Sequence, residues 1–227
     1  MVKQGEVISQ AVEDYLKMIF HIQETGRKVT TTAISEEMGV SAASVTNMVK
    51  RLVEMGLLSH NPYQEVTLTR PGEKIALEVI RHHRLLEKYL KEALGYSWDK
   101  VHEEAEKLEH FISEEFEERI DRALGRPTTD PHGEVIPSRD GKMIERKLIL
   151  LADLEVGRLA VIRQVSVKDP ERLRYLESLG LLPQVEVKVL EKKPFQGPLV
   201  IQIGLEKKEV IGQDLAQQIW VGSMKER

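Results

Sequence analysis

The sequence predicts a mainly α-helical protein with a small β domain at its C-terminal end. Apolar residues recur at helical spacing through most of residues 6–124, a stretch rich in proline and glycine follows at 126–141, and short β-rich runs begin near residue 148. At 227 residues, with 41% hydrophobic and 31% charged residues, the chain can bury more than one hydrophobic core. We therefore expect three domains, over residues 1–70, 71–146 and 147–227.

The composition excludes several classes of protein. The chain has no cysteine, so neither a disulfide framework nor a thiolate–metal bond can form. No apolar run is long enough to cross a membrane, and the N-terminus lacks the apolar core of a signal peptide. We therefore expect a cytoplasmic protein with no membrane partner. The net charge of −4 argues against non-specific binding to nucleic acid.

The first domain has the pattern of a winged helix-turn-helix. Three helices are expected, each followed by a glycine, over residues 6–23, 33–38 and 42–55. Thr32 and Ser41 are the expected N-caps of the second and third helices, because a hydroxyl group can accept a hydrogen bond from the first helical turn. A turn signal at 61–64 and alternating apolar residues at 66–69 then predict a two-stranded wing.

The third of these helices is the candidate DNA-recognition helix. Small or polar side chains occupy the positions that would enter the major groove, and asparagine can read adenine there. The candidate DNA-binding residues are Thr32, Ser41, Ala42, Ser44, Thr46, Asn47 and Lys50. The same helical arrangement also occurs in domains that bind only protein, but these side chains favour double-stranded DNA as the partner.

The middle of the chain predicts two further helices and a linker. The first helix begins at Pro71 and ends before Gly95, and the second has Ser97 as its N-cap and runs to about Leu124. The prolines and glycines of residues 126–141 then predict a segment with little regular structure.

The C-terminal part predicts a small barrel of short strands. The expected strands lie at residues 159–167, 185–190, 199–203, 209–211 and 218–221. One short helix interrupts them, with Asp169 as its N-cap, Pro170 in its first turn and Gly180 after its end.

Histidines and glutamates at helical spacing on the two middle helices predict a site for a divalent metal. His83-x-x-x-Glu87 lies on one helix and His102-x-x-x-Glu106-x-x-Glu109-His110 on the next, and residues three or four apart share a helix face. Neutral imidazole combined with carboxylate is a ligand set that binds divalent metals. So many carboxylates on coherent faces would repel one another unless a cation neutralised them.

A simpler interpretation of this pattern is a set of ordinary surface pairs. Glu106 and His110 are four residues apart and could pair on the surface of one helix. A single histidine on a helix is more often a surface or core residue than a ligand, and we interpret His21 and His60 in this way. For His83, His102 and His110, the number of matching carboxylates favours metal binding.

The motifs, taken in this order, resemble those of the diphtheria toxin repressor family of metal-dependent transcriptional repressors, and among them the three-domain manganese transport regulators. The resemblance covers nearly the whole chain. It depends on residues 13–16, 41–49, 82–87, 101–110 and 130–133. Residues 179–183 and 197–198 look like parts of the family's SH3-like domain. The resemblance implies a winged helix-turn-helix, a helical dimerisation and metal-binding domain, and an SH3-like barrel.

The resemblance also implies two sets of metal ligands. The first set matches Asp14, Glu106, Glu109 and His110, and the second matches His83, Glu87 and His102. Asp130, Asp169 and Glu171 are further candidate ligands, and Asp169 is equally well explained as a helix N-cap.

The ligand chemistry and the resemblance both indicate Mn²⁺ as the cofactor. Iron-responsive members of the family have sulfur ligands at the positions of Asp14 and Glu106, whereas this chain has hard oxygen ligands, which suit manganese. Fe²⁺ is the alternative signal, and Zn²⁺ or Co²⁺ are expected to substitute in vitro. Lys17 stands where the two-domain manganese regulators have a second acidic ligand, so we do not expect their paired-metal arrangement.

The function implied by the resemblance is repression of genes for metal uptake or homeostasis. A homodimer would place two recognition helices on a palindromic operator. A metal that joins Asp14 to Glu106, Glu109 and His110 would hold the DNA reader in one orientation, so metal and operator affinities would rise together.

A metallohydrolase is the alternative from a different class. Glu106-x-x-Glu109-His110 is one substitution away from the His-x-x-Glu-His zinc-peptidase motif, and His102-Glu103-x-x-Glu106 is close to His-Glu-x-x-His. Both lack the second histidine that those enzymes need to hold zinc with an open catalytic position. We therefore expect a regulator and no enzyme.

Overall fold

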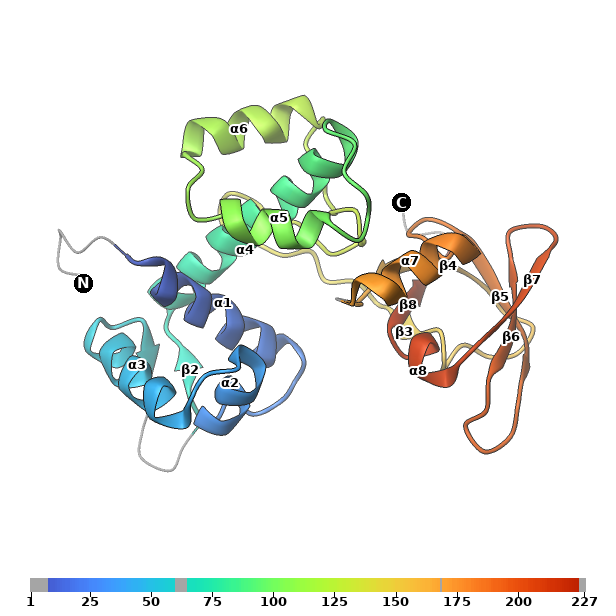
Figure 1. Cartoon of the computed structure of the whole chain (residues 1–227), viewed down its shortest axis with the longest axis horizontal. Coiled ribbons are helices and arrows are strands. Elements are labelled where there is room, and N and C mark those ends of the chain that lie inside the picture. The colour runs from blue at the N-terminus through green and yellow to red at the C-terminus, as the bar shows by residue number, and fades with distance from the viewer. Residues whose placement is uncertain (1–7, 60–64, 168, 225–227) are drawn as a thin grey trace. The chain divides into compact units, whose positions relative to one another are not determined.

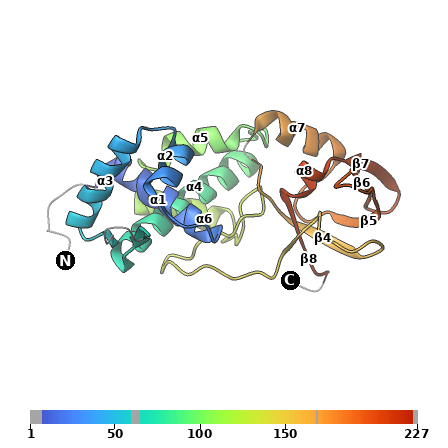
Figure 2. The same cartoon turned by 90° about the horizontal axis from the view of Figure 1, so that it is seen from below.

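The computed structural model describes residues 8–59, 65–167 and 169–224 (Figure 1 and Figure 2). The chain divides into two units. The N-terminal unit holds the described residues up to His82, together with Glu109–Ile112 and Pro137–Lys142. The C-terminal unit holds His83–Leu108, Ser113–Ile136 and the described residues from Met143 onwards. Among the described residues, no helix is both long and apolar enough to cross a membrane.

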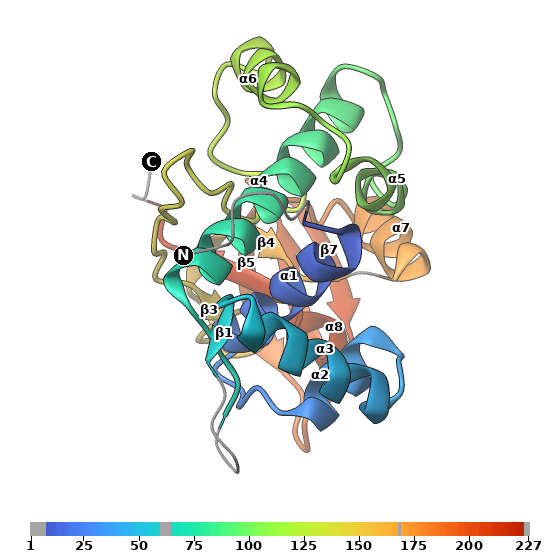
Figure 3. The same ribbon diagram turned by 90° about the vertical axis from the view of Figure 1, so that its left-hand side faces the viewer.

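The N-terminal unit contains the predicted winged helix-turn-helix (Figure 3). Its elements are α1 (Gln10–Glu24), α2 (Thr31–Met38), α3 (Ala42–Glu54), β1 (Leu58–Ser59) and β2 (Thr67–Leu68). The two strands pair antiparallel, with Leu58 opposite Leu68, and form the base of the wing. The helices bury one apolar stripe each, and these stripes meet in a core that includes Leu16, Ile34 and Leu52. The predicted turn at residues 61–64 lies outside the described residues.

Local capping explains where the second and third helices begin. The hydroxyl of Ser41 accepts a hydrogen bond from the backbone N–H of Ser44, as predicted for the N-cap of α3. The predicted N-cap of α2 was wrong by two residues: the cap is Thr30, whose hydroxyl accepts from the backbone N–H of Ala33, and Thr32 lies inside the helix. Thr30 has the extended backbone that an N-cap requires, and a run of three threonines offered no local signal to choose among them.

The middle of the chain contains three helices where the sequence predicted two. The long helix α4 (Arg70–Glu92) begins with Pro71 in its first turn, as predicted. The next predicted helix is interrupted, and forms α5 (Val101–Leu108) and α6 (Glu114–Ala123). Ser113 is the N-cap of α6, because its hydroxyl accepts from the backbone N–H of Phe116. The break places residues 109–112 in a turn.

The C-terminal part of the chain forms the predicted small β domain, which is one antiparallel sheet. Its strands are β3 (Ile149–Leu150), β4 (Leu159–Val165), β5 (Glu186–Lys192), β6 (Leu199–Ile203), β7 (Lys207–Ile211) and β8 (Ile219–Gly222). Their order in the sheet is β3-β8-β4-β5-β6-β7. Alternate side chains along β6 point into the core, as expected for a sheet with one buried face. Strand β3 and the short helix α8 (Gln213–Ala216) were not predicted, because elements this short give no periodic signal.

The predicted short helix of this domain is α7 (Pro170–Leu179), and its ends are as expected. Asp169 is the N-cap, with its carboxylate accepting from the backbone N–H of Arg172, and Gly180 ends the helix in the left-handed conformation. Trp98, from the segment before α5, is almost completely buried in the core of the β domain.

The segment 126–141 has little regular structure, as predicted, but polar bonds hold it in place. Its only described ladder contact is an isolated bridge between Thr129 and Val135. Arg84 of α4 donates to the carboxylate of Glu134 and to the backbone oxygen of Val135. Residues 126–136 of this loop therefore have a defined path beside α4 within the C-terminal unit.

Candidate metal centres

The first candidate centre, here called the first cluster, consists of Asp14, Glu109 and His110 in the N-terminal unit. Asp14 lies on α1, and the other two residues lie in the turn that follows α5. His110 Nε2 is 2.9 Å from Asp14 Oδ1 and 3.4 Å from Glu109 Oε1. One ligand atom from each residue lies within 4.8 Å of the others, so a single ion could contact all three.

Two further residues hold the ligands of the first cluster in position. The carboxylate of Glu13, which precedes Asp14 on α1, is 2.5 Å from Nδ1 of His110. With Nδ1 bonded in this way, the Nε2 atom of His110 is the one that faces Asp14 and could bind a metal. His82 Nδ1 is 3.1 Å from the backbone oxygen of Glu109, which ties the turn to α4. Sequence analysis missed both residues, because neither has ligand spacing within its own helix.

When no metal is bound, the carboxylates of Asp14 and Glu109 repel each other, and nearby positive groups offset part of this repulsion. Burial is the main reason that the pKa of Asp14 is raised, and the nearby Glu109 carboxylate adds to the shift. His110 and Lys17 act in the opposite direction. The Nζ atom of Lys17 is 2.7 and 2.9 Å from the two carboxylate oxygens of Glu109.

The second candidate centre, here called the second cluster, consists of His83 and Glu87 on α4 and His102 on α5. His83 and Glu87 are one helical turn apart, and His83 Nε2 is 2.9 Å from Glu87 Oε1. His102 Nδ1 is 3.1 Å from the same Glu87 oxygen and 3.0 Å from His83 Nε2. Two imidazole nitrogens and a carboxylate oxygen thus converge on one point. Glu106 Oε1 lies 3.8 Å from His102 Nε2, and Glu106, His83 and His102 each offer a ligand atom within 4.8 Å of the others.

The electrostatics of the second cluster depend on its burial. Burial opposes ionisation of Glu87, but the imidazoles of His83, His102 and His132 outweigh it and hold the pKa of that carboxyl well below its usual range. A carboxylate that is ionised and almost fully buried requires positive charge beside it.

His132 is a fourth residue at the second cluster that sequence analysis did not select as a ligand. Its Nε2 atom is 4.0 Å from Glu87 Oε1, and its ring stacks on Trp98 with 5.1 Å between centroids. Neither ring nitrogen has a hydrogen-bond partner among the described residues, although the side chain is buried. Burial also lowers the pKa of His132, which favours the neutral form that binds metals. An unpaired neutral imidazole beside a buried carboxylate fits a divalent cation. The sequence feature that could have identified His132 as a candidate ligand is its position two residues after Asp130, which was itself a candidate.

Asp130 shapes the loop that presents His132. Its Oδ1 atom accepts hydrogen bonds from the backbone N–H groups of His132, at 2.8 Å, and Glu134, at 2.9 Å. Burial raises the pKa of Asp130 well above its usual range, and the charges of Glu87 and Glu134 add to this effect. A divalent cation at the second cluster would relieve that repulsion.

The predicted DNA-binding residues all lie at exposed positions. On α3, Val45, Val49 and Leu52 face the core. The candidates Thr32, Ser41, Ala42, Ser44, Thr46, Asn47 and Lys50 are exposed to solvent. This exposed face is what a recognition helix needs to enter the major groove, and the base contacts themselves stay a prediction.

Three family models match successive parts of the chain between residues 8 and 222. The N-terminal DNA binding domain of the iron dependent repressors matches residues 8–66, their metal binding and dimerisation domain matches residues 69–138, and the FeoA domain matches residues 149–222. The iron-dependent repressor IdeR of Mycobacterium leprae (strain TN) is 32% identical over 206 residues, which are 86% of this chain and 89% of that protein. The diphtheria toxin repressor of Corynebacterium efficiens is 30% identical over 199 residues, or 83% of this chain and 85% of that protein. The chain belongs to the diphtheria toxin repressor family.

A solved structure of the same kind agrees with this assignment. A manganese-dependent transcriptional repressor in complex with manganese has 39% sequence identity and a TM-score of 0.87, and the match covers 94% of this chain and 100% of that chain. The resemblance inferred from the motifs is therefore confirmed, as is the predicted fold class. The exact domain boundaries stay predictions.

In this member of the diphtheria toxin repressor family, the predicted ligands are grouped differently from the expectation in one respect. Glu106 was placed with Asp14, Glu109 and His110, but its carboxylate is grouped with His83 and His102. The physical reason is that α5 ends at Leu108, so Glu109 and His110 leave the helix face on which Glu106 lies. The proposed surface pair of Glu106 and His110 on one helix is removed by the same break. The role of Glu106 as a ligand stays a prediction.

Two other candidate ligands of this repressor belong to neither cluster. Asp169 and Glu171 are exposed on or beside α7, and neither belongs to a metal-ligand group among the described residues. The carboxylate of Asp169 caps α7, which is the simpler of its two predicted roles. Their contribution to a metal site also stays a prediction.

Proposed function

We propose that the protein is a transcriptional repressor that Mn²⁺ activates, and that it binds a palindromic operator as a homodimer in the cytoplasm. The observation that supports this most directly is the first cluster, in which two carboxylates and one imidazole join α1 of the winged helix-turn-helix to the turn after α5. The class of function is inferred from the family. The metal is proposed from the types of candidate ligand.

The choice of manganese depends on the chemistry of the donors. The clusters offer carboxylate oxygens and imidazole nitrogens, and the chain has no cysteine. Hard oxygen ligands suit manganese, whereas sulfur ligands favour softer metals. Zinc and cobalt bind such ligands as tightly or more tightly in general, so we propose that they substitute in vitro and that cellular supply determines the signal. Fe²⁺ is the alternative within the same family.

The mechanism follows from which segments the first cluster joins. In the metal-free protein, Asp14 and Glu109 carry like charges a few ångströms apart, which disfavours their approach. When bound, the metal supplies the positive charge that both carboxylates share. Asp14 on α1 is then held against Glu109 and His110, and the recognition helix is fixed with it. Metal binding thus selects one orientation of the recognition helix. Because the operator binds that same orientation, metal and operator must strengthen each other's binding by the same factor.

The homodimer is proposed from the family's dimerisation domain, which matches residues 69–138. A two-fold axis would present two copies of α3 to half-sites about one helical turn of DNA apart, or a multiple of that distance. A palindromic operator is the sequence that such a dimer can read.

Fluorescence anisotropy with a labelled palindromic operator at fixed salt tests this proposal. We expect Mn²⁺ to raise the operator affinity by at least about tenfold, or roughly 1.4 kcal/mol. The variant Asp14→Ala should lose most of that response, whereas Asp153→Ala, which removes an exposed aspartate outside both clusters, should keep it. Equal affinity of the unmodified protein with and without Mn²⁺ would disprove the proposal.

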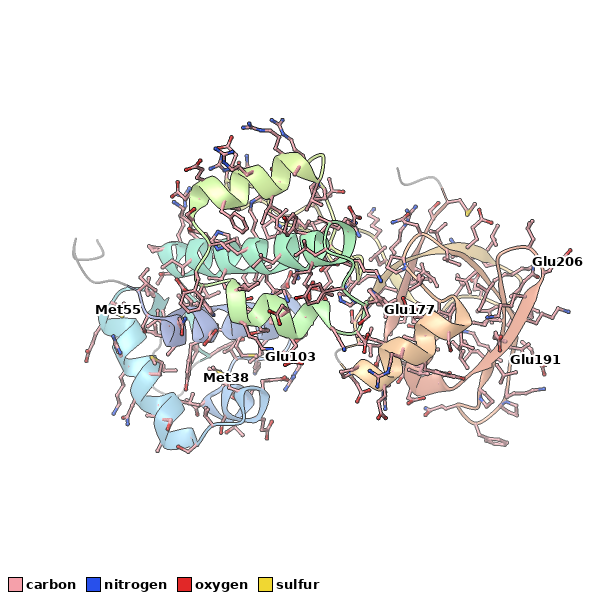
Figure 4. The ribbon with its side chains drawn as sticks, turned by 45° about the horizontal axis from the view of Figure 1, so that its top comes forward. Met38, Met55, Glu103, Glu177, Glu191 and Glu206 are labelled. Carbon is pink, nitrogen blue, oxygen red and sulfur yellow. The ribbon has the colours of Figure 1, made fainter. Side chains whose placement is uncertain are left out.

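The structure disfavours the metallohydrolase alternative. A His-x-x-Glu-His site requires its residues on one helix, but Glu109 and His110 lie in a turn. In the His102-Glu103 pair, the Glu103 side chain projects away from α4 (Figure 4) and its carboxylate pairs with Lys107. It is therefore poorly placed to act as a general base at the second cluster. Metal-dependent hydrolysis of a peptide or phosphoester, abolished by Glu106→Gln, would support the alternative.

A further inference from the structure

Lys17 places a positive charge inside the first cluster. It lies on α1 one helical turn after Asp14, so its side chain extends along the same face as that ligand. Its Nζ atom contacts both carboxylate oxygens of Glu109, at 2.7 and 2.9 Å. The Glu109 side chain is 0% exposed and that of Lys17 is 20% exposed, so water screens this pair weakly.

The ammonium group contacts both of the oxygen atoms that Glu109 could offer to a metal ion. A metal bound to a carboxylate oxygen and an ammonium bound to the same oxygen would repel each other at short distance. The ligand atoms of Asp14, Glu109 and His110 lie within 4.8 Å of one another, so a metal that contacts all three must use a Glu109 oxygen that Lys17 also contacts. Binding of a divalent ion must therefore move Lys17 away from at least one oxygen of Glu109.

We propose that Lys17 is the resident counter-ion of Glu109 in the metal-free protein, and that its displacement sets the metal concentration at which the first cluster fills. The inference rests on the proposed function, in that the first cluster must bind metal. Lys17 acts through Glu109 and is a positioning residue, because it contacts a ligand and is itself no ligand.

The exchange of one cation for another has two consequences. The metal-free protein keeps a partner for a carboxylate whose burial would otherwise be costly. The same pair lowers metal affinity, because part of the binding free energy is used to separate Lys17 from Glu109. The repressor would therefore stay inactive until the free metal concentration exceeds a higher threshold.

The test compares Lys17→Met with Lys28→Met. Lys28 is an exposed lysine in the same unit, so the two variants change the net charge equally. Mn²⁺ binding is measured by isothermal titration calorimetry without DNA, and the binding phase that disappears in Asp14→Ala identifies the first cluster. We expect Lys17→Met to tighten that phase by about tenfold, in the range of one charge-assisted hydrogen bond. Lys28→Met should leave it within about twofold, because charges on the surface are screened by salt.

Thermal unfolding supplies a second readout that does not depend on metal affinity. Lys17→Met should lower the melting temperature of the metal-free protein, and saturating Mn²⁺ should restore most of the loss. If the methionine variant does not fold, Lys17→Gln replaces it, because glutamine removes the charge but keeps a hydrogen-bond donor. Its changes in metal affinity and melting temperature should have the same direction and be smaller.

The outcomes separate the inference from the proposed function. An unchanged first phase in Lys17→Met, or an equal loss of melting temperature with and without Mn²⁺, overturns the role of Lys17 and leaves the metal site intact. An equal tightening in Lys28→Met also overturns it, because net charge alone would then explain the effect. If the unmodified protein has no phase that Asp14→Ala removes, the proposed function of the first cluster fails, and the inference fails with it.

Discussion

Replacement of Gly133 by alanine should destabilise the protein and weaken metal binding at the second cluster together. Gly133 has φ +87°, a conformation that residues with a side chain rarely adopt. A Cβ atom there would lie 1.9 Å from the backbone oxygen of Arg163 on β4 and 2.8 Å from its carbonyl carbon. Both distances are far shorter than van der Waals contact, so β4 and the loop at Gly133 must separate.

The expected loss of stability is the sum of two effects. The left-handed conformation costs about 1–2 kcal/mol and the overpacking costs about 1–3 kcal/mol, so Gly133→Ala should lose about 2–5 kcal/mol. The same loop presents His132, whose backbone oxygen accepts a hydrogen bond from Val165 of β4 at 2.9 Å. Movement of the loop should therefore carry the imidazole of His132 away from Glu87 and lower the affinity of the second cluster.

Gly157 provides a matched control for this prediction. It has φ +86°, and an added Cβ would meet no atom within 4 Å. Gly157→Ala should therefore lose only the stability that the left-handed conformation costs. The difference in free energy of unfolding between the two variants then measures the cost of the collision with Arg163. Urea denaturation of the metal-free proteins gives the stabilities, and calorimetry with Mn²⁺ gives the affinities. Equal losses of stability in the two variants, or an unchanged second-cluster affinity in Gly133→Ala, would refute the reasoning.

Two further substitutions test the ligand chemistry. His132→Phe keeps a ring against Trp98 but removes both nitrogens, so we expect at least about a tenfold loss of affinity at the second cluster, the range found for residues that support metal ligands. Its melting temperature without metal should be unchanged or higher, because two buried nitrogens without hydrogen-bond partners are removed; a loss of stability with unchanged affinity would contradict a ligand role. Glu106→Cys should shift the order of metal affinities towards zinc, cobalt and iron, since sulfur replaces oxygen, and an unchanged order in competition titrations would argue against Glu106 as a ligand.

Several features of this repressor were readable from the sequence because they depend on neighbouring residues. The caps at Ser41 and Asp169 each use a hydrogen bond to a backbone group three residues away. Gly39 and Gly180 end their helices in the left-handed conformation that only glycine adopts freely. The pair of His83 and Glu87 likewise follows from one turn of helix. Most of the candidate ligands, and the oxygen-rich chemistry from which manganese is proposed, came from the same local patterns and the family resemblance that they carry.

Only the tertiary structure decided how those candidate ligands are grouped. The apolar and acidic periodicity continues across residues 109–112, and periodicity does not reveal that the chain leaves the helix there. The bonds that hold the residues of the first cluster in position join residues far apart in the sequence: Lys17 and Glu109 are 92 residues apart, and Glu13 and His110 are 97 apart. His132 is a ligand candidate only because a loop brings it to Glu87. Local patterns determine which side chains are available to a metal, whereas the packing of distant segments determines which of them meet.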